Sequence, residues 1–302
     1  MRPRVIAVVG PTAAGKSGLG LALARALGGE VINADSMQLY RGMDIGTAKL
    51  TPAERGGVPH HLLDIWDVTQ AANVADYQRL ARAAVDDTLA RGLVPILVGG
   101  SGLYVRAVLD DLRFPGTDPD LRARLEAELA AHGPAPLHER LAERDPAAAG
   151  SILPSNGRRI IRALEVIELS GGPFSATMPD YASLYPAEQI GLLLDRGDLD
   201  LRIAARAERM FGQGFVEEVR QLEQRGLRDG LTASRALGYA QVLRCLAGEW
   251  TQDQALAETV RATKRFARRQ ESWFRRDPRV TWLDAGEAEA DLAAESLATI
   301  GA

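Results

Sequence analysis

Short apolar runs alternate with amphipathic stretches along the first hundred residues. The β-branched run Arg4–Val9 predicts a buried first strand, and apolar residues at helical spacing predict helices over Ser17–Leu27 and Val74–Ala90. Further strands are predicted at Glu30–Ala34, His61–Ile65 and Val94–Val98. Strands that alternate with helices in this way indicate an α/β fold with a parallel sheet.

The pattern changes after Phe114-Pro115-Gly116. Asp118-Pro119 predicts a helix start, and helices interrupted by prolines follow it. A strand signal returns at Gln189–Leu194, and helices are expected from Leu199 onward. This order predicts a helical unit, residues 115–187, inserted into an α/β core made of residues 1–114 and 188–302.

The composition narrows the class of protein. The chain has 302 residues, of which 46% are hydrophobic and 25% charged, as is typical of a globular protein. Its single cysteine, Cys245, is interpreted as a core thiol, and the lack of a disulfide framework favours a cytoplasmic location. No apolar run approaches the length of a membrane span. A net charge of −4 argues against indiscriminate coating of nucleic acid.

The strongest motif is an eight-residue loop between the first predicted strand and helix, Gly10-Pro11-Thr12-Ala13-Ala14-Gly15-Lys16-Ser17. It matches the phosphate-loop pattern G-x-x-x-x-G-K-S/T in its required context. In such a loop the backbone N–H groups point at phosphate oxygens and the helix N-terminus adds a positive dipole. Lys16 supplies a charge and Ser17 a hydroxyl ligand for magnesium. We therefore predict a site for a diphosphate or triphosphate.

Two acidic residues lie where predicted strands end. Asp35 and Asp64 are both candidates to order magnesium, and Asp35 is also placed to accept a proton from a second substrate beside the phosphate loop. For Asp35, a helix cap or a surface turn is the alternative. The adjacent His60 and His61 point to opposite faces of a strand, which argues against a zinc site.

A second glycine-rich strand-to-helix turn, Gly99-Gly100-Ser101-Gly102, follows the strand Val94–Val98. A nucleotide hydrolase usually carries a second magnesium-ordering Asp at such a position. The glycines indicate close backbone approach to a ligand, to which Ser101 offers a hydroxyl. A tight turn without a ligand is the alternative.

The stretch Arg261–Arg279 has the clearest local excess of positive charge, and Phe266, Trp273 and Phe274 are interleaved with it. Its basic residues are Arg261, Lys264, Arg265, Arg268, Arg269, Arg275, Arg276 and Arg279. Basic side chains neutralise phosphates and aromatic side chains stack on bases, so the stretch favours RNA as a partner. A solvated helix face with its aromatic residues packed inward is the alternative. A smaller basic group in the inserted unit consists of Arg158, Arg159 and Arg162.

Taken together, these segments resemble the tRNA dimethylallyltransferases, also called the tRNA isopentenyltransferase family. The resemblance follows the family's order over nearly the whole chain. Its segments are the phosphate loop, Asp35–Lys49, His60–Ile65, Pro95–Tyr104, Arg159–Val166, Ser234–Tyr239 and Arg268–Arg276.

The resemblance implies a fold like that of P-loop NTPases and a transferase that modifies tRNA. Its members move a dimethylallyl group from dimethylallyl diphosphate to the N6 amine of the adenosine 3′ of the anticodon. They act on tRNAs that read codons beginning with U, and they release diphosphate. The resemblance also implies Mg²⁺ as cofactor and an inserted unit that grips the anticodon stem; we expect a monomer.

Individual roles follow from the same resemblance. Gly10 to Ser17 would hold the diphosphate, Asp35 would act as the general base, and Lys16 and Ser101 would take part in catalysis. The implied tRNA contacts are Asp35, Ser36, Met37, Gln38, Ser101, Arg122, Arg158, Arg159, Ile160, Ile161, Arg162, Arg235, Ala236, Leu237, Gly238, Tyr239 and Ala240.

The chain departs from the family pattern at several positions. Ser17 and Ser101 stand where the family usually has Thr, and both keep the hydroxyl group. The segment Pro154–Gly157, Ala240 and Lys264 also depart, and they bear on tRNA contacts rather than on the diphosphate site. The alternatives are a small-molecule kinase that uses ATP, an enzyme that prenylates free adenine nucleotides, and a nucleotide-gated RNA-binding protein without chemistry.

Overall fold

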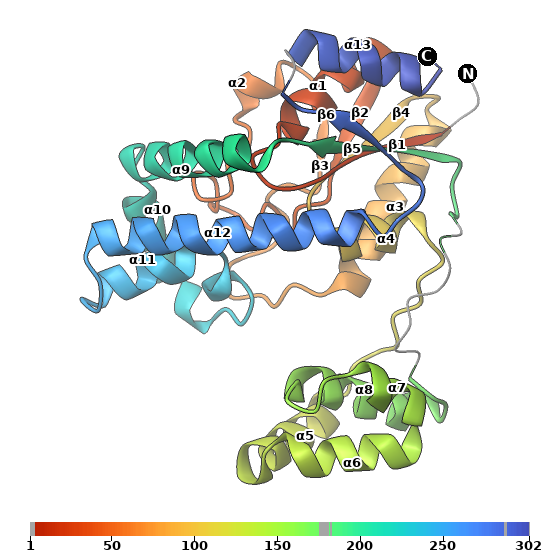
Figure 1. The fold of residues 1–302 in the computed structure, drawn as a ribbon, viewed down its shortest axis with the longest axis vertical. Coiled ribbons are helices and arrows are strands. Elements are labelled where there is room, and N and C mark those ends of the chain that lie inside the picture. The colour runs from red at the N-terminus through yellow and green to blue at the C-terminus, as the bar shows by residue number, and fades with distance from the viewer. Residues whose placement is uncertain (1–3, 175–180, 182, 287–288, 302) are drawn as a thin grey trace. The chain divides into compact units, whose positions relative to one another are not determined.

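The computed structural model describes residues 4–174, 181, 183–286 and 289–301, and the fold is built on one parallel sheet. Among these residues, six strands pair in the order β3-β2-β4-β1-β5-β6 (Figure 1). The strands are β1 (Val5–Val9), β2 (Gly29–Asn33), β3 (His60–His61), β4 (Val94–Val98), β5 (Ala187–Leu193) and β6 (Val280–Asp284). Each neighbouring pair is parallel, so the predicted α/β fold is confirmed.

Helices cover both faces of the sheet (Figure 1). Ile6 and Val8 of β1 pack with α1 (Lys16–Leu27) and α13 (Glu289–Thr299) on one face. Val5, Ala7 and Val9 pack on the other face, with α3 (Val74–Ala90), α4 (Gly102–Leu109) and the end of α12 (Gln252–Phe274). A central parallel strand is therefore buried on both sides, which explains its continuous apolar run.

A second group of helices packs beside the sheet around its own apolar cluster. The cluster joins buried side chains of the segment after β2, such as Tyr40 and Met43, to Phe215 and Tyr239. Its elements are α9 (Arg196–Gly212), α10 (Phe215–Gln224), the 3₁₀ turns Leu227–Asp229 and Ala233–Arg235, α11 (Tyr239–Leu246) and α12. The short helix α2 (Pro52–Arg55) lies earlier in the chain, with Thr51 as its N-cap.

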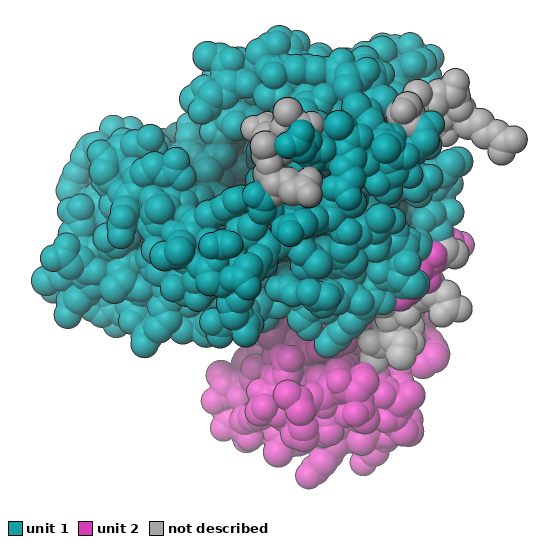
Figure 2. Space-filling view, turned by 45° about the horizontal axis from the view of Figure 1, so that its top comes forward, with its two compact units in different colours: residues 1–110, 183–302 teal, residues 111–182 magenta. Residues whose placement is uncertain are grey.

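The chain divides into two compact units, residues 1–110 with 183–302 and residues 111–182, which Figure 2 colours separately. The second unit contains α5 (Pro119–His132), α6 (Pro134–Arg144), α7 (Pro146–Ser151) and α8 (Gly157–Ser170). The predicted start at Asp118-Pro119 is confirmed, because the Asp118 carboxylate accepts the N–H groups of Asp120 and Leu121 and caps α5. Residues 175–180 and 182 of the predicted insertion lie outside the described residues.

The chain leaves and re-enters the larger unit at adjoining residues. Asp110 and Ser183 form an antiparallel bridge, and the Leu184 N–H donates to the Leu109 carbonyl at 2.6 Å. Arg279 donates to Asp110 Oδ1 at 2.6 Å and to Ser183 Oγ at 2.8 Å. Asp110 is fully buried and also binds Arg106, so two guanidinium groups neutralise this carboxylate.

Two predictions about strands were wrong. The expected strand His61–Ile65 is reduced to His60–His61, because Leu62 and Asp64 adopt left-handed backbone with φ of 62° and 58°. Helices were expected to the C-terminus, but Val280–Asp284 forms β6 at the edge of the sheet beside β5. The run is short and lies close behind a long helix, so its signal was weak.

Candidate active site at the carboxyl ends of the strands

A cavity of about 1060 Å³ opens in the larger unit where β1, β2 and β4 end. Its walls are the phosphate loop, Asp35, the segment 44–51 and one side of α9. Ligands of open α/β sheets bind at this edge, because the loops that follow parallel strands converge there. The cavity therefore brings together the phosphate loop and Asp35, which the sequence placed at strand ends.

The phosphate loop has a backbone that only a few residue types tolerate. Gly10 has φ of 131°, and a Cβ there would lie 2.8 Å from the Leu192 carbonyl oxygen. Lys16 begins α1, and its ammonium donates to the Pro11 carbonyl at 2.6 Å. Burial lowers the pKa of Lys16 to about 8, although Asp35 acts in the opposite direction. Since its one hydrogen bond goes to a neutral carbonyl, Lys16 remains suited to an anionic ligand.

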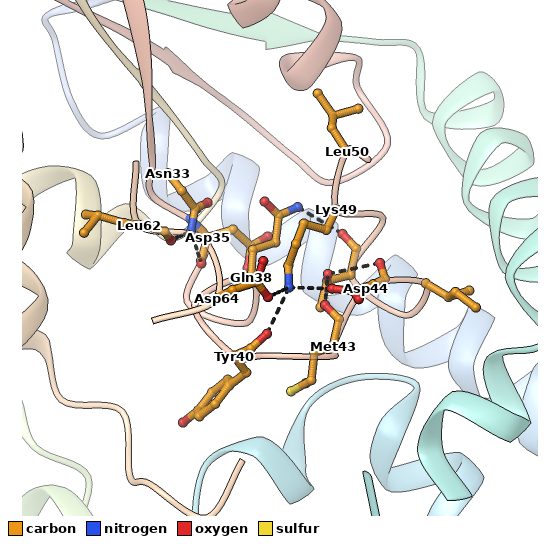
Figure 3. A network of polar contacts seen from close by, with 12 residues as sticks. Asn33, Asp35, Gln38, Tyr40, Met43, Asp44, Lys49, Leu50, Leu62 and Asp64 are labelled. Atoms are coloured by element: carbon orange, nitrogen blue, oxygen red, sulfur yellow. Dashed lines mark hydrogen bonds and ion pairs between the residues drawn. The ribbon is translucent and has the colours of Figure 1, made fainter. Parts of the chain in front are cut away.

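Asp35 follows β2 in a turn that the Asn33 side chain organises. The Asn33 amide donates to the carbonyl oxygens of Asp35 and Leu62, both at 3.0 Å, and its oxygen accepts the Asp35 N–H at 2.9 Å (Figure 3). One Asp35 oxygen accepts the Met37 N–H at 2.9 Å. The carboxylate lines the cavity, and its charge acts on both Lys16 and Arg206. Asp35 therefore faces the cationic side chains of the site.

The second glycine turn packs directly against the turn of Asp35. A Cβ on Gly99 would lie 2.3 Å from the Ala34 carbonyl, so only glycine fits there. Ser101 begins α4 as its N-cap, and its Oγ lies 3.4 Å from both the backbone nitrogen and the hydroxyl of Ser36. The structure thus brings Ser101 next to the residue that follows Asp35.

Arg206 is a site residue that the sequence analysis missed. It lies on α9, and its guanidinium donates to Thr12 Oγ1 and to the Thr47 carbonyl, each at 3.2 Å. Burial lowers its pKa from the ordinary arginine value, and the charge of Asp35 raises it. Arg206 therefore links two walls of the cavity and adds a second half-buried cation beside the phosphate loop. Arg202 and Arg209 of α9 also line the cavity, a spacing that places all three on one side of the helix.

Lys49 holds the wall of the cavity formed by the segment 44–51. Its ammonium donates to the Tyr40 carbonyl at 2.9 Å and to carboxylate oxygens of Asp44 and Asp64, both at 2.6 Å (Figure 3). The side chain is only 3% exposed, whereas the two carboxylates are about half exposed. Asp64, considered as a magnesium ligand from the sequence, is thus engaged with a lysine.

Glu218 of α10 binds the backbone of the segment 44–46 in the same wall. Its carboxylate accepts the N–H groups of Asp44, Ile45 and Gly46 at 2.6 to 3.2 Å, and the Tyr239 hydroxyl at 2.6 Å. Ala236 and Tyr239, which the resemblance implied as tRNA contacts, have buried side chains. Of the same stretch, Arg235 is exposed, Leu237 and Ala240 are half-buried, and Gly238 is buried with φ of 85°.

In the helical unit the implied tRNA residues lie along α8 and α5. Arg158 and Arg159 are exposed, whereas Ile160 and Ile161 are buried in the core of that unit. Arg122 and Arg162 both bind Glu165, whose side chain is fully buried. Hydrogen bonds from both guanidinium groups lower the pKa of Glu165, although burial acts in the opposite direction. Glu165 therefore holds these arginines in fixed positions.

The basic stretch Arg261–Arg279 combines inward-packed aromatic side chains with basic side chains of which several are paired. Phe274 is buried, Phe266 is half-buried, and Trp273 is 38% exposed and packs on Gly102. Several charges are paired within the larger unit: Arg261 with Glu258, Lys264 and Arg268 with Asp200, Arg275 with Glu271, and Arg279 with Asp277 and Asp110. Arg265, Arg268, Arg269 and Arg276 are exposed on or just after α12.

The two histidines of β3 belong to the scaffold. His61 Nε2 pairs with Glu30 at 2.7 Å, and the His60 Nδ1–H donates to the Val58 carbonyl. Hydrogen bonds from Arg91 and His61 lower the pKa of Glu30 to about 2. Across the described part of the chain, His, Cys, Asp and Glu side chains form no cluster of three that is able to hold a metal ion. No helix in that part is long and apolar enough to cross a membrane.

The parallel sheet and the phosphate loop between β1 and α1 define a P-loop α/β protein. Comparison with known proteins identifies the family. Residues 38–277 match the family model described as IPP transferase. The chain therefore belongs to the IPP transferase family, and the resemblance drawn from its motifs is confirmed.

Several relatives are similar over most of their length. A tRNA dimethylallyltransferase of Thermobifida fusca is 71% identical, over 92% of this chain and 89% of the relative. The crystal structure of a tRNA isopentenylpyrophosphate transferase from Bacillus halodurans is 42% identical with a TM-score of 0.75, covering 99% of this chain and 96% of that one. A eukaryotic dimethylallyltransferase acting on tRNA has a TM-score of 0.87 at 25% identity, covering 98% and 78%. These neighbours confirm the predicted P-loop NTPase-like fold.

Proposed function

We propose that this protein transfers a dimethylallyl group from dimethylallyl diphosphate to the N6 amine of the adenosine 3′ of the anticodon, in tRNAs that read codons beginning with U. The observation that carries the proposal is the common cavity. A carboxylate, Asp35, faces a phosphate loop and two half-buried cations, Lys16 and Arg206. Such a site is able to hold a diphosphate leaving group beside a base for the attacking amine.

The reaction exchanges one bond for another at the allylic carbon. The C1–O bond to the diphosphate breaks as the N6–C1 bond forms, and the amine loses one proton. Asp35 accepts that proton, since its carboxylate faces the cavity. Ser101 lies beside Ser36, the residue that follows Asp35, and would position this general base through its hydroxyl.

The leaving group requires stabilisation of the negative charge that develops on it. Lys16, Arg206 and the amides of the phosphate loop would supply this stabilisation. Mg²⁺ fits the loop, because it usually keeps several waters and binds phosphate oxygens together with one or two protein oxygens. Ser17, exposed at the first turn of α1, would be its protein ligand. When bound, the ion neutralises charge on the departing diphosphate.

The helical unit would bind the anticodon stem. Support comes from exposed Arg158 and Arg159 on α8 and from Arg122 and Arg162, which Glu165 holds in place. The exposed arginines of α12 would add contacts to the loop backbone. The target adenosine must leave its stack to enter the cavity, at a cost of a few kcal/mol.

Two other enzymes are less well supported. A small-molecule kinase would use ATP at the same loop, but the turn after β4 has Gly99-Gly100 where a magnesium-ordering Asp is usual. An enzyme that prenylates free adenine nucleotides would share the cavity but would have no use for the arginines of α8. The family relatives named above also act on tRNA by name.

A direct assay separates these functions. Purified protein receives dimethylallyl diphosphate and Mg²⁺ with unmodified tRNA in one arm and AMP in the other. Mass spectrometry of the digested tRNA should find a five-carbon addition on one adenosine, 3′ of the anticodon. A product formed only with AMP, or tRNA binding without any product, would contradict the proposal.

A further inference from the structure

One buried amide joins the two glycine-rich loops of the site. Gln270 lies on α12 and is 6% exposed. Its Oε1 accepts the backbone N–H of Thr12 in the phosphate loop at 2.9 Å. Its Nε2 donates to the carbonyl of Gly100 in the second glycine turn, also at 2.9 Å. A single side chain therefore spans the loops that follow β1 and β4.

The chemistry of the two partners restricts this position to one kind of side chain. Thr12 offers a backbone donor and Gly100 a backbone acceptor. The bridging side chain therefore needs one acceptor and one donor at the same distance from its own backbone. A Gln amide provides both, and its orientation is settled by the partners. Glutamate would place an acceptor against the Gly100 carbonyl, and an apolar side chain would leave two buried backbone groups unsatisfied.

The surrounding packing is equally close. A Cβ on Gly100 would lie 2.2 Å from Gln270 Nε2, and one on Gly102 would lie 2.0 Å from the Trp273 ring. Gln270 and Trp273 are three residues apart on α12, so one side of that helix rests on the turn that carries Ser101. Because the Thr12 N–H donates to Gln270, it is not available to a diphosphate as a phosphate-loop donor.

We propose that Gln270 is a positioning residue that sets the phosphate loop in register with the Ser101 turn. The inference rests on the proposed function, in which the first loop holds the allylic diphosphate and the second lies beside the target adenosine. Gln270 then determines the distance between the reacting carbon and nitrogen without touching either substrate. Its effect is on the rate of the bound complex rather than on the binding of either substrate.

The physical reason is the steep dependence of rate on alignment. A misplacement of about 1 Å between reacting groups costs about 100-fold in rate, even when the residue that causes it is remote from the chemistry. Each substrate still has its own binding surface when the bridge is removed. We therefore expect a loss of rate with little loss of affinity.

The test compares Gln270→Met, a variant of similar length that lacks both hydrogen bonds, with the wild type. Thr259→Val is the matched control, because Thr259 is equally buried on α12 and its hydroxyl bonds only within that helix. Single-turnover rates are measured with saturating dimethylallyl diphosphate, Mg²⁺ and tRNA. Calorimetry gives the affinity for dimethylallyl diphosphate without tRNA, filter binding gives the affinity for tRNA, and thermal unfolding reports folding.

For Gln270→Met we expect a single-turnover rate about 100-fold below wild type, with both dissociation constants within about threefold and Thr259→Val near wild type. A rate within about threefold of wild type would overturn the proposal. So would a fall in diphosphate affinity that matches the fall in rate, or an equal loss in Thr259→Val, because either result makes Gln270 a purely structural residue.

Gln270→Glu provides a second variant if Gln270→Met does not fold. It keeps the acceptor for Thr12 and loses the donor to Gly100, so a rate loss of the same order is expected. An active Gln270→Glu, or the failure of both variants to fold, rejects a positioning role. The wild-type arm tests the proposed function separately: without prenylated tRNA from the wild type, that function fails, and variant rates are compared only against an active wild type.

Discussion

Two walls of the cavity each contain a lysine, and the two lysines differ in their bonding partners. The difference separates a side chain suited to binding a ligand from one that stabilises the wall itself. Lys16 donates to one neutral carbonyl, and burial lowers its pKa to about 8. Lys49 is more deeply enclosed but binds two carboxylates and a carbonyl. The charge of Lys16 is therefore uncompensated by a direct ion pair and suits an incoming anion. The charge of Lys49 is already matched by the protein and serves to hold the segment 44–49.

A lysine in the wall of a cavity is thus not by itself evidence of ligand binding. What distinguishes the two is whether an acidic partner within the protein already matches the ammonium charge. The contrast predicts that some cavity residues affect activity and others affect stability. Variants of these residues test the contrast, and they follow from the largest expected effect to the smallest.

The largest effect is expected at Asp35, which, like Lys16, is expected to act on activity rather than on stability. Asp35→Asn keeps the shape of the turn but removes the base, so we expect a single-turnover rate lower by about 10²- to 10⁴-fold with tRNA affinity unchanged. Asp44→Asn is the control, because Asp44 lines the same cavity but pairs with Lys49. A wild-type rate in Asp35→Asn would remove Asp35 from the role of base.

Lys16→Met should lower the affinity for dimethylallyl diphosphate by about 10- to 100-fold, since a hydrogen bond to a charged group contributes about 1.5–3 kcal/mol. Calorimetry without tRNA measures this directly, because no product forms. The free energy of unfolding should change little. Unchanged affinity would show that the phosphate loop does not hold the diphosphate through this lysine.

Lys49→Met should show the reverse behaviour. Its loss leaves the Tyr40 carbonyl with only the longer hydrogen bond from the Met43 N–H, at 3.4 Å, and leaves two carboxylates without their cation, although both carboxylates are exposed enough to be hydrated. We expect a loss of about 1–3 kcal/mol in the free energy of unfolding, measured by urea denaturation. If Lys16→Met destabilised the protein more than Lys49→Met, the distinction between the two lysines would be wrong.

The smallest effect concerns pH. A bound diphosphate favours the charged form of Lys16, whose pKa in the free protein is about 8. Affinity should therefore be full below pH 8 and fall by up to about tenfold per unit above it. The test is calorimetry with dimethylallyl diphosphate between pH 7 and about 9.5, with Lys16→Met as the reference. A pH profile of the same slope in Lys16→Met would assign the titration to another group.

The sequence predicted those parts of the site that are local in the chain. The phosphate loop depends on eight consecutive residues and the strand and helix beside it, and the turn of Asp35 depends on Asn33 two positions away. Gln270, in contrast, binds Thr12, which is 258 positions away in the sequence, and Gly100, which is 170 positions away. Arg206 binds Thr12 across a separation of 194 positions. Such contacts are set by the packing of α9 and α12, which no local pattern encodes.

The error at His61–Ile65 has a related cause. The apolar residues of that run favour a strand, but the Leu62 carbonyl is bound by Asn33 and the Asp64 carboxylate by Lys49. These tertiary contacts accompany a left-handed backbone at both residues, which costs on the order of 1–2 kcal/mol each. Local preference was therefore outweighed by bonds to other walls of the cavity.

The antiparallel bridge between Asp110 and Ser183 has a consequence for how the chain can be rearranged. Because the two ends of the interruption are already hydrogen-bonded and Arg279 holds both, a tight turn is able to join them in place of residues 111–182. None of the described residues of that span belongs to the sheet or lines the cavity. The larger unit thus keeps the described residues of its sheet and cavity when a different insert replaces that span at this junction.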